Sequence, residues 1–142
     1  MVKQISVFLE NKEGRLSEVT RVLAENGINI RALSIADTTD FGILRVIVND
    51  PDKAYQVLTG EGFTVSVKEV LAIGITDEPG SLAKALLSLH TNGIVIEYMY
   101  AFLGKADEKA MVILKVSDNE KTVAVLEKIG VSVIAAQNVY KL

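Results

Sequence analysis

The chain has 142 residues, of which 49% are hydrophobic and 23% charged, and its formal net charge is −3. These values are typical of a folded globular protein and argue against intrinsic disorder, while the absence of cysteine excludes disulfides, thiolate metal sites and a catalytic thiol. With no run of Lys and Arg, the sequence argues against nucleic acid and anionic membranes as partners. No signal-peptide pattern and no membrane-length apolar stretch is present, so we expect a cytoplasmic protein.

The first half of the chain predicts the element order β-α-β-β-α-β. Residues 4–9 alternate loosely and are rich in β-branched side chains, which predicts a strand. The apolar residues that follow recur at helical spacing until Asn26-Gly27, where glycine indicates a helix end. Asp50-Pro51 predicts the cap and first turn of a second helix. The remaining strands of this half are expected over three apolar runs: 28–36, 43–48 and 63–67.

The second half predicts the same order. Helices are expected over residues 81–92 and after Ser117-Asp118-Asn119-Glu120, where Ser and Glu have capping-box spacing. Strands are expected over residues 70–75, 94–103, 110–116 and 131–140. Two β-α-β-β-α-β halves predict an α+β fold of two ferredoxin-like sandwiches, each an antiparallel four-stranded sheet with both helices on one face.

Residue matches between the halves support this duplication. At an offset of 66 residues, Gly14 falls on Gly80, and Asn26-Gly27-Ile28 falls on Asn92-Gly93-Ile94. Further along, residues 43–46 match residues 113–116 at an offset of 70, which predicts four extra residues in the preceding connection of the second half. We therefore expect one domain over residues 1–68 and a second over residues 69–142.

The sequence offers no residues for several functions that this fold serves. The expected third strands, residues 42–48 and 110–116, carry no aromatic ring on which an RNA base could stack. Metal carriers of this fold need cysteines, and His90 is the single histidine. No nucleophile–base pair, paired carboxylates in an obvious cleft or phosphate-binding loop is apparent. We expect no catalytic residue, no metal and no cofactor, and hence a protein that is not an enzyme.

The two strand–helix junctions are the most informative segments. They read Glu10-Asn11-Lys12-Glu13-Gly14-Arg15-Leu16 and Thr76-Asp77-Glu78-Pro79-Gly80-Ser81-Leu82, and each half continues through its helix to a Gly-Ile motif. These residues resemble the ACT domain family of amino-acid-sensing regulatory modules, whose pattern is roughly Asn/Asp-x-Pro-Gly-x-Leu, a helix, then Gly-Ile-Asn-Ile. The first half has Glu13 in place of the proline, and the second half has Val95 in place of the last asparagine.

The resemblance implies tandem ACT domains that pair into a continuous antiparallel sheet. It also implies a free amino acid bound between the first loop of one unit and the second strand of another. The implied ligand-binding residues are Asn11, Lys12, Glu13, Gly14, Arg15, Leu16, Asn29, Ile30, Asp77, Glu78, Pro79, Gly80, Ser81, Leu82, Val95 and Ile96.

The chemistry of the junctions fits such a ligand. A helix that begins at Gly14 or Gly80 presents unpaired N–H groups and a partial positive charge to a carboxylate. Asn11 or Asp77 can accept a hydrogen bond from an ammonium group, and Asn29 can both donate and accept. Simpler roles are also open, because the glycines suit turns and Asn11 and Asp77 suit helix caps.

The arrangement of the units decides which residues would meet. Pairing within the chain would bring the Asn11 loop to Val95 and Ile96, and the Asp77 loop to Asn29 and Ile30. Pairing of first halves across a homodimer would instead bring Asn11 to Asn29. We expect a homodimer, because exposed sheet edges need covering. The expected function is regulation of a partner enzyme in trans; the alternative is a structural protein–protein interaction module without a small-molecule ligand.

Overall fold

The computed structural model describes residues 1–10, 13–37, 41–103 and 109–142, and these residues form two compact units. The N-terminal unit consists of Lys3–Lys68 and Tyr140–Leu142, and the C-terminal unit of Met1–Val2 and Glu69–Val139. No helix of these described ranges is long and apolar enough to cross a membrane. The expected domain limits, 1–68 and 69–142, stay a prediction.

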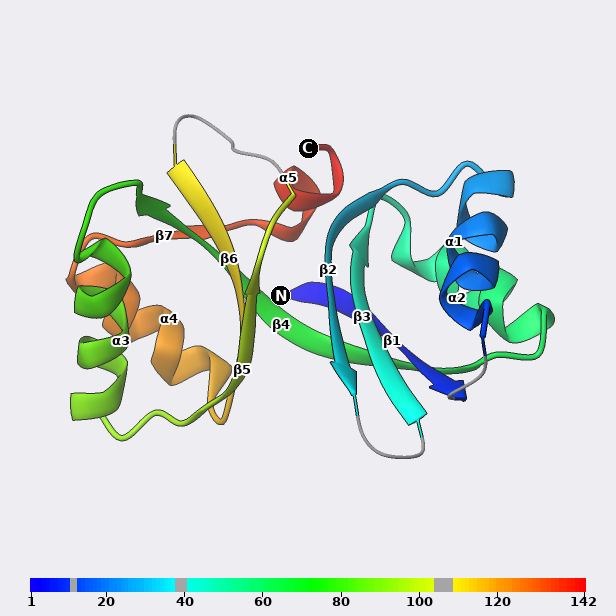
Figure 1. The fold of residues 1–142 in the computed structure, drawn as a ribbon. Helices are drawn as coiled ribbons and strands as arrows, with labels where there is room; N and C mark the ends of the chain where they lie inside the picture. The colour runs from blue at the N-terminus through cyan, green and yellow to red at the C-terminus, as the bar shows by residue number, and fades with distance from the viewer. Residues whose placement is uncertain (11–12, 38–40, 104–108) are drawn as a thin grey trace. The chain divides into compact units, whose positions relative to one another are not determined.

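The N-terminal unit is a sheet in the order β2-β3-β1-β4 with both helices on one face (Figure 1). Neighbouring pairs β1–β3 and β2–β3 are antiparallel. Its elements are β1 (Val2–Glu10), α1 (Arg15–Glu25), β2 (Ile30–Asp37), β3 (Phe41–Val48), α2 (Pro51–Gly60) and the first part of β4 (Thr64–Thr76).

The C-terminal unit repeats this arrangement with the order β5-β6-β4-β7. Both longer helices again cover one face of the sheet (Figure 1). Besides the second part of β4, its elements are α3 (Ser81–Thr91), β5 (Ile96–Ala101), β6 (Lys109–Val116), α4 (Asn119–Lys128), β7 (Ser132–Ile134) and α5 (Ala136–Tyr140). The prediction of two ferredoxin-like sandwiches in a continuous antiparallel sheet is confirmed.

One long strand replaces two predicted ones. The strands expected over residues 63–67 and 70–75 are a single strand, β4, that closes the first sheet and opens the second. The two residues between them, Lys68 and Glu69, include neither glycine nor proline, so nothing in the backbone interrupts the extended conformation.

The last predicted strand is wrong over most of its length. Within residues 131–140 only β7 is a strand, and α5 follows it. The N–H groups of Asn138 and Val139 both donate to the carbonyl of Ala135, at 3.0 and 3.2 Å. Alanine, glutamine and asparagine are poor strand formers, so the segment after β7 coils into a helical turn that buries Val139.

The register of the strands corrects the offset between the halves. Glu10 pairs with Phe41, and the equivalent Thr76 pairs with Lys109, so the third strands are related by 68 residues rather than 70. The predicted four extra residues are therefore two. The offset of 70 still aligned apolar residues of the two third strands with each other. Side chains of a strand alternate between the two faces of the sheet with a period of two, so an alignment error of two residues keeps core-facing positions matched with core-facing positions.

Each unit has a hydrophobic core between its sheet and its helices. Leu58 on α2 and Leu126 on α4 occupy equivalent places, and both are fully buried. The sheet side of each core comes from alternate residues of the central strands, such as Ile5 in the N-terminal unit and Ile73 in the C-terminal unit. The residues of the strand–helix junctions are therefore attached to two separately packed sandwiches.

Aspartates cap the second helix of each unit. The Asp50 carboxylate accepts from the Lys53 N–H at 3.1 Å, as the sequence predicts. In α4, however, the cap is Asp118, which accepts from the Lys121 N–H at 3.0 Å. The predicted capping box at Ser117 is wrong, because the Ser117 hydroxyl accepts from the Val95 N–H at 3.1 Å instead.

Removal of the α4 cap should destabilise the protein modestly. We expect Asp118→Ala to lower the free energy of unfolding by about 1 kcal/mol, because a backbone N–H of the first turn loses its acceptor. Urea unfolding followed by circular dichroism measures this change. Asp118→Asn is the control, since asparagine caps helices about as well as aspartate; equal losses in both variants would contradict the role of the cap.

Candidate functional site

The first helix of each unit begins at a glycine in the left-handed conformation. Gly14 has φ +83° and precedes α1, and Gly80 has φ +88° and precedes α3. The N-cap residues of these helices are the glycines themselves, which have no side chain with which to cap. A Cβ added at either glycine would meet no described atom within 4 Å. The glycines are therefore required by backbone conformation, and no described side chain crowds either of them.

A cavity of about 440 Å³ lies at the junction of the C-terminal unit. We call it the C-terminal pocket, and it is formed by the end of β4, the start of α3, the start of β6 and the turn between α4 and β7. Its lining residues are Gly74, Ile75, Thr76, Glu78, Pro79, Gly80, Ser81, Lys84, Lys109, Ile129, Gly130 and Val131. Its volume lies within the usual range of small-molecule sites, roughly 300–1,000 Å³.

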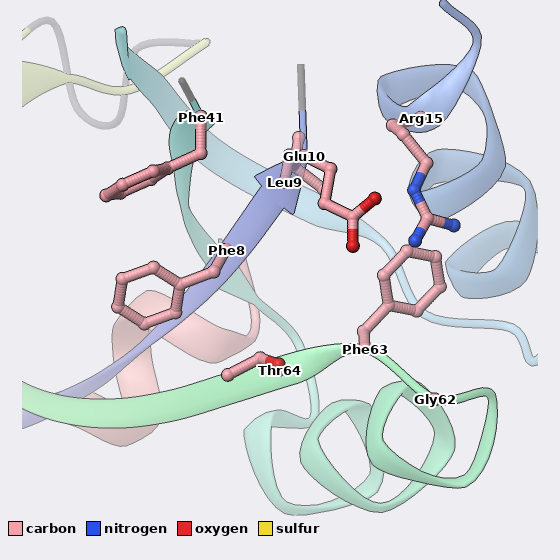
Figure 2. A pocket seen from close by; sticks show the side chains of 8 residues that line it. All are labelled: Phe8, Leu9, Glu10, Arg15, Phe41, Gly62, Phe63 and Thr64. Atoms are coloured by element: carbon pink, nitrogen blue, oxygen red, sulfur yellow. The ribbon is translucent and has the colours of Figure 1, made fainter. Parts of the chain in front are cut away.

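The N-terminal unit has a smaller cavity, of about 270 Å³, at the equivalent place. Figure 2 shows this N-terminal pocket. The rings of Phe8 and Phe41 lie on one side of Glu10, and the Phe63 ring and the Arg15 side chain lie on the other. Its lining residues are Phe8, Leu9, Glu10, Arg15, Phe41, Gly62, Phe63 and Thr64. The two pockets thus occupy the same position in the repeated fold.

Arg15 fills part of the N-terminal pocket. Its guanidinium carbon lies 5.3 Å from the centre of the Phe63 ring, and its Nη1 donates to the Glu18 carboxylate at 3.0 Å. The side chain is 31% exposed, yet its Nε is buried with no hydrogen-bond partner among the described residues. The equivalent residue of the C-terminal pocket is Ser81, which leaves that space open.

The two pockets also differ at a pair of positions on neighbouring strands, where one unit has two aromatic rings and the other has glycine and lysine. Phe8 and Phe41 are cross-strand neighbours with ring centres 6.2 Å apart. Gly74 and Lys109 stand in their places in the C-terminal unit. A Cβ on Gly74 would lie 3.4 Å from Cδ of Lys109, so the lysine stem passes over the glycine. The Lys109 ammonium then donates to the Ser132 hydroxyl on β7, at 3.1 Å.

The structure brings only some of the predicted residues together. Glu78, Pro79, Gly80 and Ser81 line the C-terminal pocket, and Arg15 lines the N-terminal pocket. Asp77 is exposed and does not line the C-terminal pocket. Glu13 and Gly14 are exposed in the turn before α1. Leu16 is 39% exposed, whereas Leu82 packs on the C-terminal core. Asn11 and Lys12 lie outside the described residues.

The predicted second-strand residues lie at the opposite end of each sheet. Ile30 pairs with Val48 at the end of β3, whereas the first loop is near Phe41 at its start. The exposed Asn29 is held there through its backbone, which donates to the Asn49 side-chain oxygen at 2.9 Å. In the C-terminal unit, likewise, Ile96 pairs with Val116 at the end of β6, whereas Thr76, before the α3 loop, pairs with Lys109 at its start. Val95 precedes Ile96 and lies at the same end of the sheet. Within one unit, therefore, the two predicted groups do not form one pocket.

Several lining residues were not predicted from the sequence. The turn before the last strand supplies Gly62 and Phe63 in one unit and Gly130 and Val131 in the other. The match of Gly62 with Gly130 in the repeat was a signal for this turn, because both have positive φ. Lys84 and Lys109 gave no such signal, because their places in the pocket depend on the strand register.

Comparison with known proteins identifies the repeated unit. The ACT domain pair family matches residues 1–142. The chain belongs to the ACT domain family. The ACT domain is a regulatory fold, and the pair of ACT domains spans residues 1–142 of this chain. Among the curated proteins none matches it.

Solved structures of other proteins show the same fold. The protein BT0572 from Bacteroides thetaiotaomicron is 48% identical, with 99% of this chain and 96% of that chain covered and a TM-score of 0.92. The ligand-free regulatory subunit of aspartate kinase from Thermus thermophilus is 18% identical, with 90% and 92% covered and a TM-score of 0.65. The aspartate kinase from Synechocystis is 21% identical and has a TM-score of 0.59; the ACT pair covers 27% of that longer chain and 95% of this one.

Proposed function

We propose that this ACT domain pair is an amino-acid-responsive regulator that binds a free amino acid in the C-terminal pocket and controls a partner enzyme in trans. The observation that carries the proposal is the cavity of about 440 Å³ at the start of α3, where a helix end that begins at a glycine and charged side chains line one space. A cytoplasmic regulator with no catalytic role of its own would fit the composition and the family.

The lining of the C-terminal pocket complements both charged groups of an amino acid. The Ser81 N–H already donates to the Glu78 carbonyl at 3.3 Å. The partial positive charge of the α3 N-terminus still favours a carboxylate. Glu78 lines the same pocket and supplies an acceptor for the ammonium group. Gly80 contributes no side chain, so a ligand can approach the backbone closely.

Dimerisation is part of the proposal. β2 and β5 are the end strands of the hydrogen-bonded order, so within the described ranges each pairs along one edge only. Such edges are commonly covered by another chain. A second copy that paired there could place Asn29 and Ile30, or Val95 and Ile96, against a first loop of its partner. Regulation then requires the amino acid to bind one arrangement of the assembly more tightly than another.

A thermal-shift screen tests amino-acid binding. We expect at least one of the proteinogenic amino acids at millimolar concentration to raise the melting temperature of the full chain, since a ligand at 100 times its Kd adds about 2.7 kcal/mol of stability. We expect Glu78→Gln to weaken that response, because it removes the anionic acceptor for the ammonium. Glu120→Gln, on an exposed glutamate of α4, is the control.

The outcomes separate the two candidate functions. If no amino acid shifts the melting temperature, the proposal fails and a structural interaction module is favoured. If Glu78→Gln and Glu120→Gln respond alike, the ligand binds elsewhere than in the C-terminal pocket.

A further inference from the structure

We propose that the C-terminal pocket selects an amino acid with a carboxylate in its side chain. This inference rests on the proposed function, because it names the class of amino acid that the same pocket would take. The supporting observations are the charges that line the pocket, the way in which Lys109 is held, and the contrast with the N-terminal pocket.

Cationic groups outnumber anionic groups in the C-terminal pocket. Two of its lining residues, Lys84 and Lys109, carry ammonium groups, and one, Glu78, carries a carboxylate. The N-terminus of α3 adds a further partial positive charge. A neutral zwitterion would leave one lysine without a counter-charge, whereas an amino acid with two carboxylates would balance the lining. Charge complementarity of this kind determines selectivity more than it determines affinity.

Lys109 is held in place at both its stem and its ammonium group. Its stem crosses β4 above Gly74, and its ammonium reaches the exposed Ser132 on β7. The crossing leaves room for only a small residue at position 74, because a Cβ there would already lie 3.4 Å from the stem. A single hydroxyl uses one of the three donors of an ammonium group. In the proposed complex, the other donors of the Lys109 ammonium face a ligand carboxylate at this end of the pocket.

Three groups of the ligand can then be assigned to three places. The α-carboxylate faces the start of α3 near Gly80 and Lys84, the ammonium faces Glu78, and the side-chain carboxylate faces Lys109. The last place distinguishes acidic amino acids from all others. In the N-terminal pocket the same position is occupied by Phe41, whose ring is tilted by 54° against that of Phe8, so this position offers no cation to a second carboxylate.

Isothermal titration calorimetry of the full chain tests this selectivity. The probes are the sodium salts of L-aspartate and L-glutamate, their neutral amides L-asparagine and L-glutamine, and succinate, all at one pH and ionic strength. We expect one of the acidic amino acids to bind at least about tenfold more tightly than its amide, the ratio that one charge-assisted hydrogen bond provides. Succinate should bind weakly, because it has no ammonium group for Glu78.

Lysine variants locate the selectivity within the pocket. Lys109→Met keeps the length of the stem and removes the charge, so we expect it to reduce the preference for the acidic amino acid over its amide to near unity. Lys84→Met should weaken both ligands, since it acts on the α-carboxylate that they share. Lys121→Met is the matched control, because Lys121 is exposed in the same unit and does not line the pocket; it should leave both the affinity and the preference unchanged.

The failure of this inference is distinguishable from the failure of the proposed function. If a neutral amino acid binds as tightly as an acidic one, or if Lys109→Met retains the preference, the inference is overturned while amino-acid binding stands. If succinate binds as tightly as aspartate, the assignment of Glu78 to the ammonium is wrong. If no amino acid binds, both proposals fail.

Discussion

Truncation of Leu126 to alanine is expected to lower the free energy of unfolding by about 2–5 kcal/mol. The side chain is fully buried between α4 and the sheet of the C-terminal unit, so its loss removes transfer free energy and leaves a cavity. Leu58 has the equivalent place in the N-terminal unit, and Leu58→Ala is expected to have an effect of the same size. Urea unfolding of the full chain, followed by circular dichroism, measures both.

Leu87 provides the matched control for these truncations. It lies on α3 but is 62% exposed, so Leu87→Ala should change the free energy of unfolding by no more than about 0.5 kcal/mol. If Leu126→Ala were as mild as Leu87→Ala, the C-terminal core would not be packed as described. If only one of the two buried truncations were severe, the units would differ in how much their cores contribute.

The fold could be predicted from the sequence because its signals are local and appear twice. Helical spacing of apolar residues, glycine at helix ends and the Asp50-Pro51 cap each need only a few neighbouring residues, and the repeat supplied an independent check. The errors lie where a choice depends on distant residues. Residues 64–76 form one strand that pairs with strands of both sheets, and residues 136–140 coil where pairing with β4 has ended and the local residues are poor strand formers.

For the candidate site, the sequence could predict the backbone conformation at the helix start but not the side chains that line the pocket. The motif around Gly80 located the helix start, because left-handed glycines have a sequence signature. The chemistry of the pockets was missed because it depends on cross-strand neighbours. Phe8 meets Phe41, and Gly74 meets Lys109, only when the register is known, and the predicted offset between the third strands was wrong by two residues.

Replacement of Gly74 by phenylalanine is expected to abolish ligand binding without unfolding the protein. This change transplants the aromatic residue of the N-terminal pocket, Phe8, into the equivalent place of the C-terminal pocket. The ring would occupy the path of the Lys109 stem and withdraw its ammonium from Ser132. We expect the Kd of the responding amino acid to rise at least about a hundredfold, because both the space and a charge-assisted contact are lost.

Gly74→Ala is the control that separates loss of the binding space from a general loss of stability. Glycine inside a strand costs roughly 0.5–1 kcal/mol relative to alanine, and a Cβ at residue 74 would meet Lys109 and Ile134 at 3.4 and 3.6 Å, which is ordinary contact. Gly74→Ala is therefore expected to bind the amino acid normally and to unfold at a higher urea concentration than the native chain. Calorimetric titration and urea unfolding of both variants decide the matter. A Gly74→Phe protein that is folded and binds with unchanged affinity would show that the ligand does not occupy this part of the cavity.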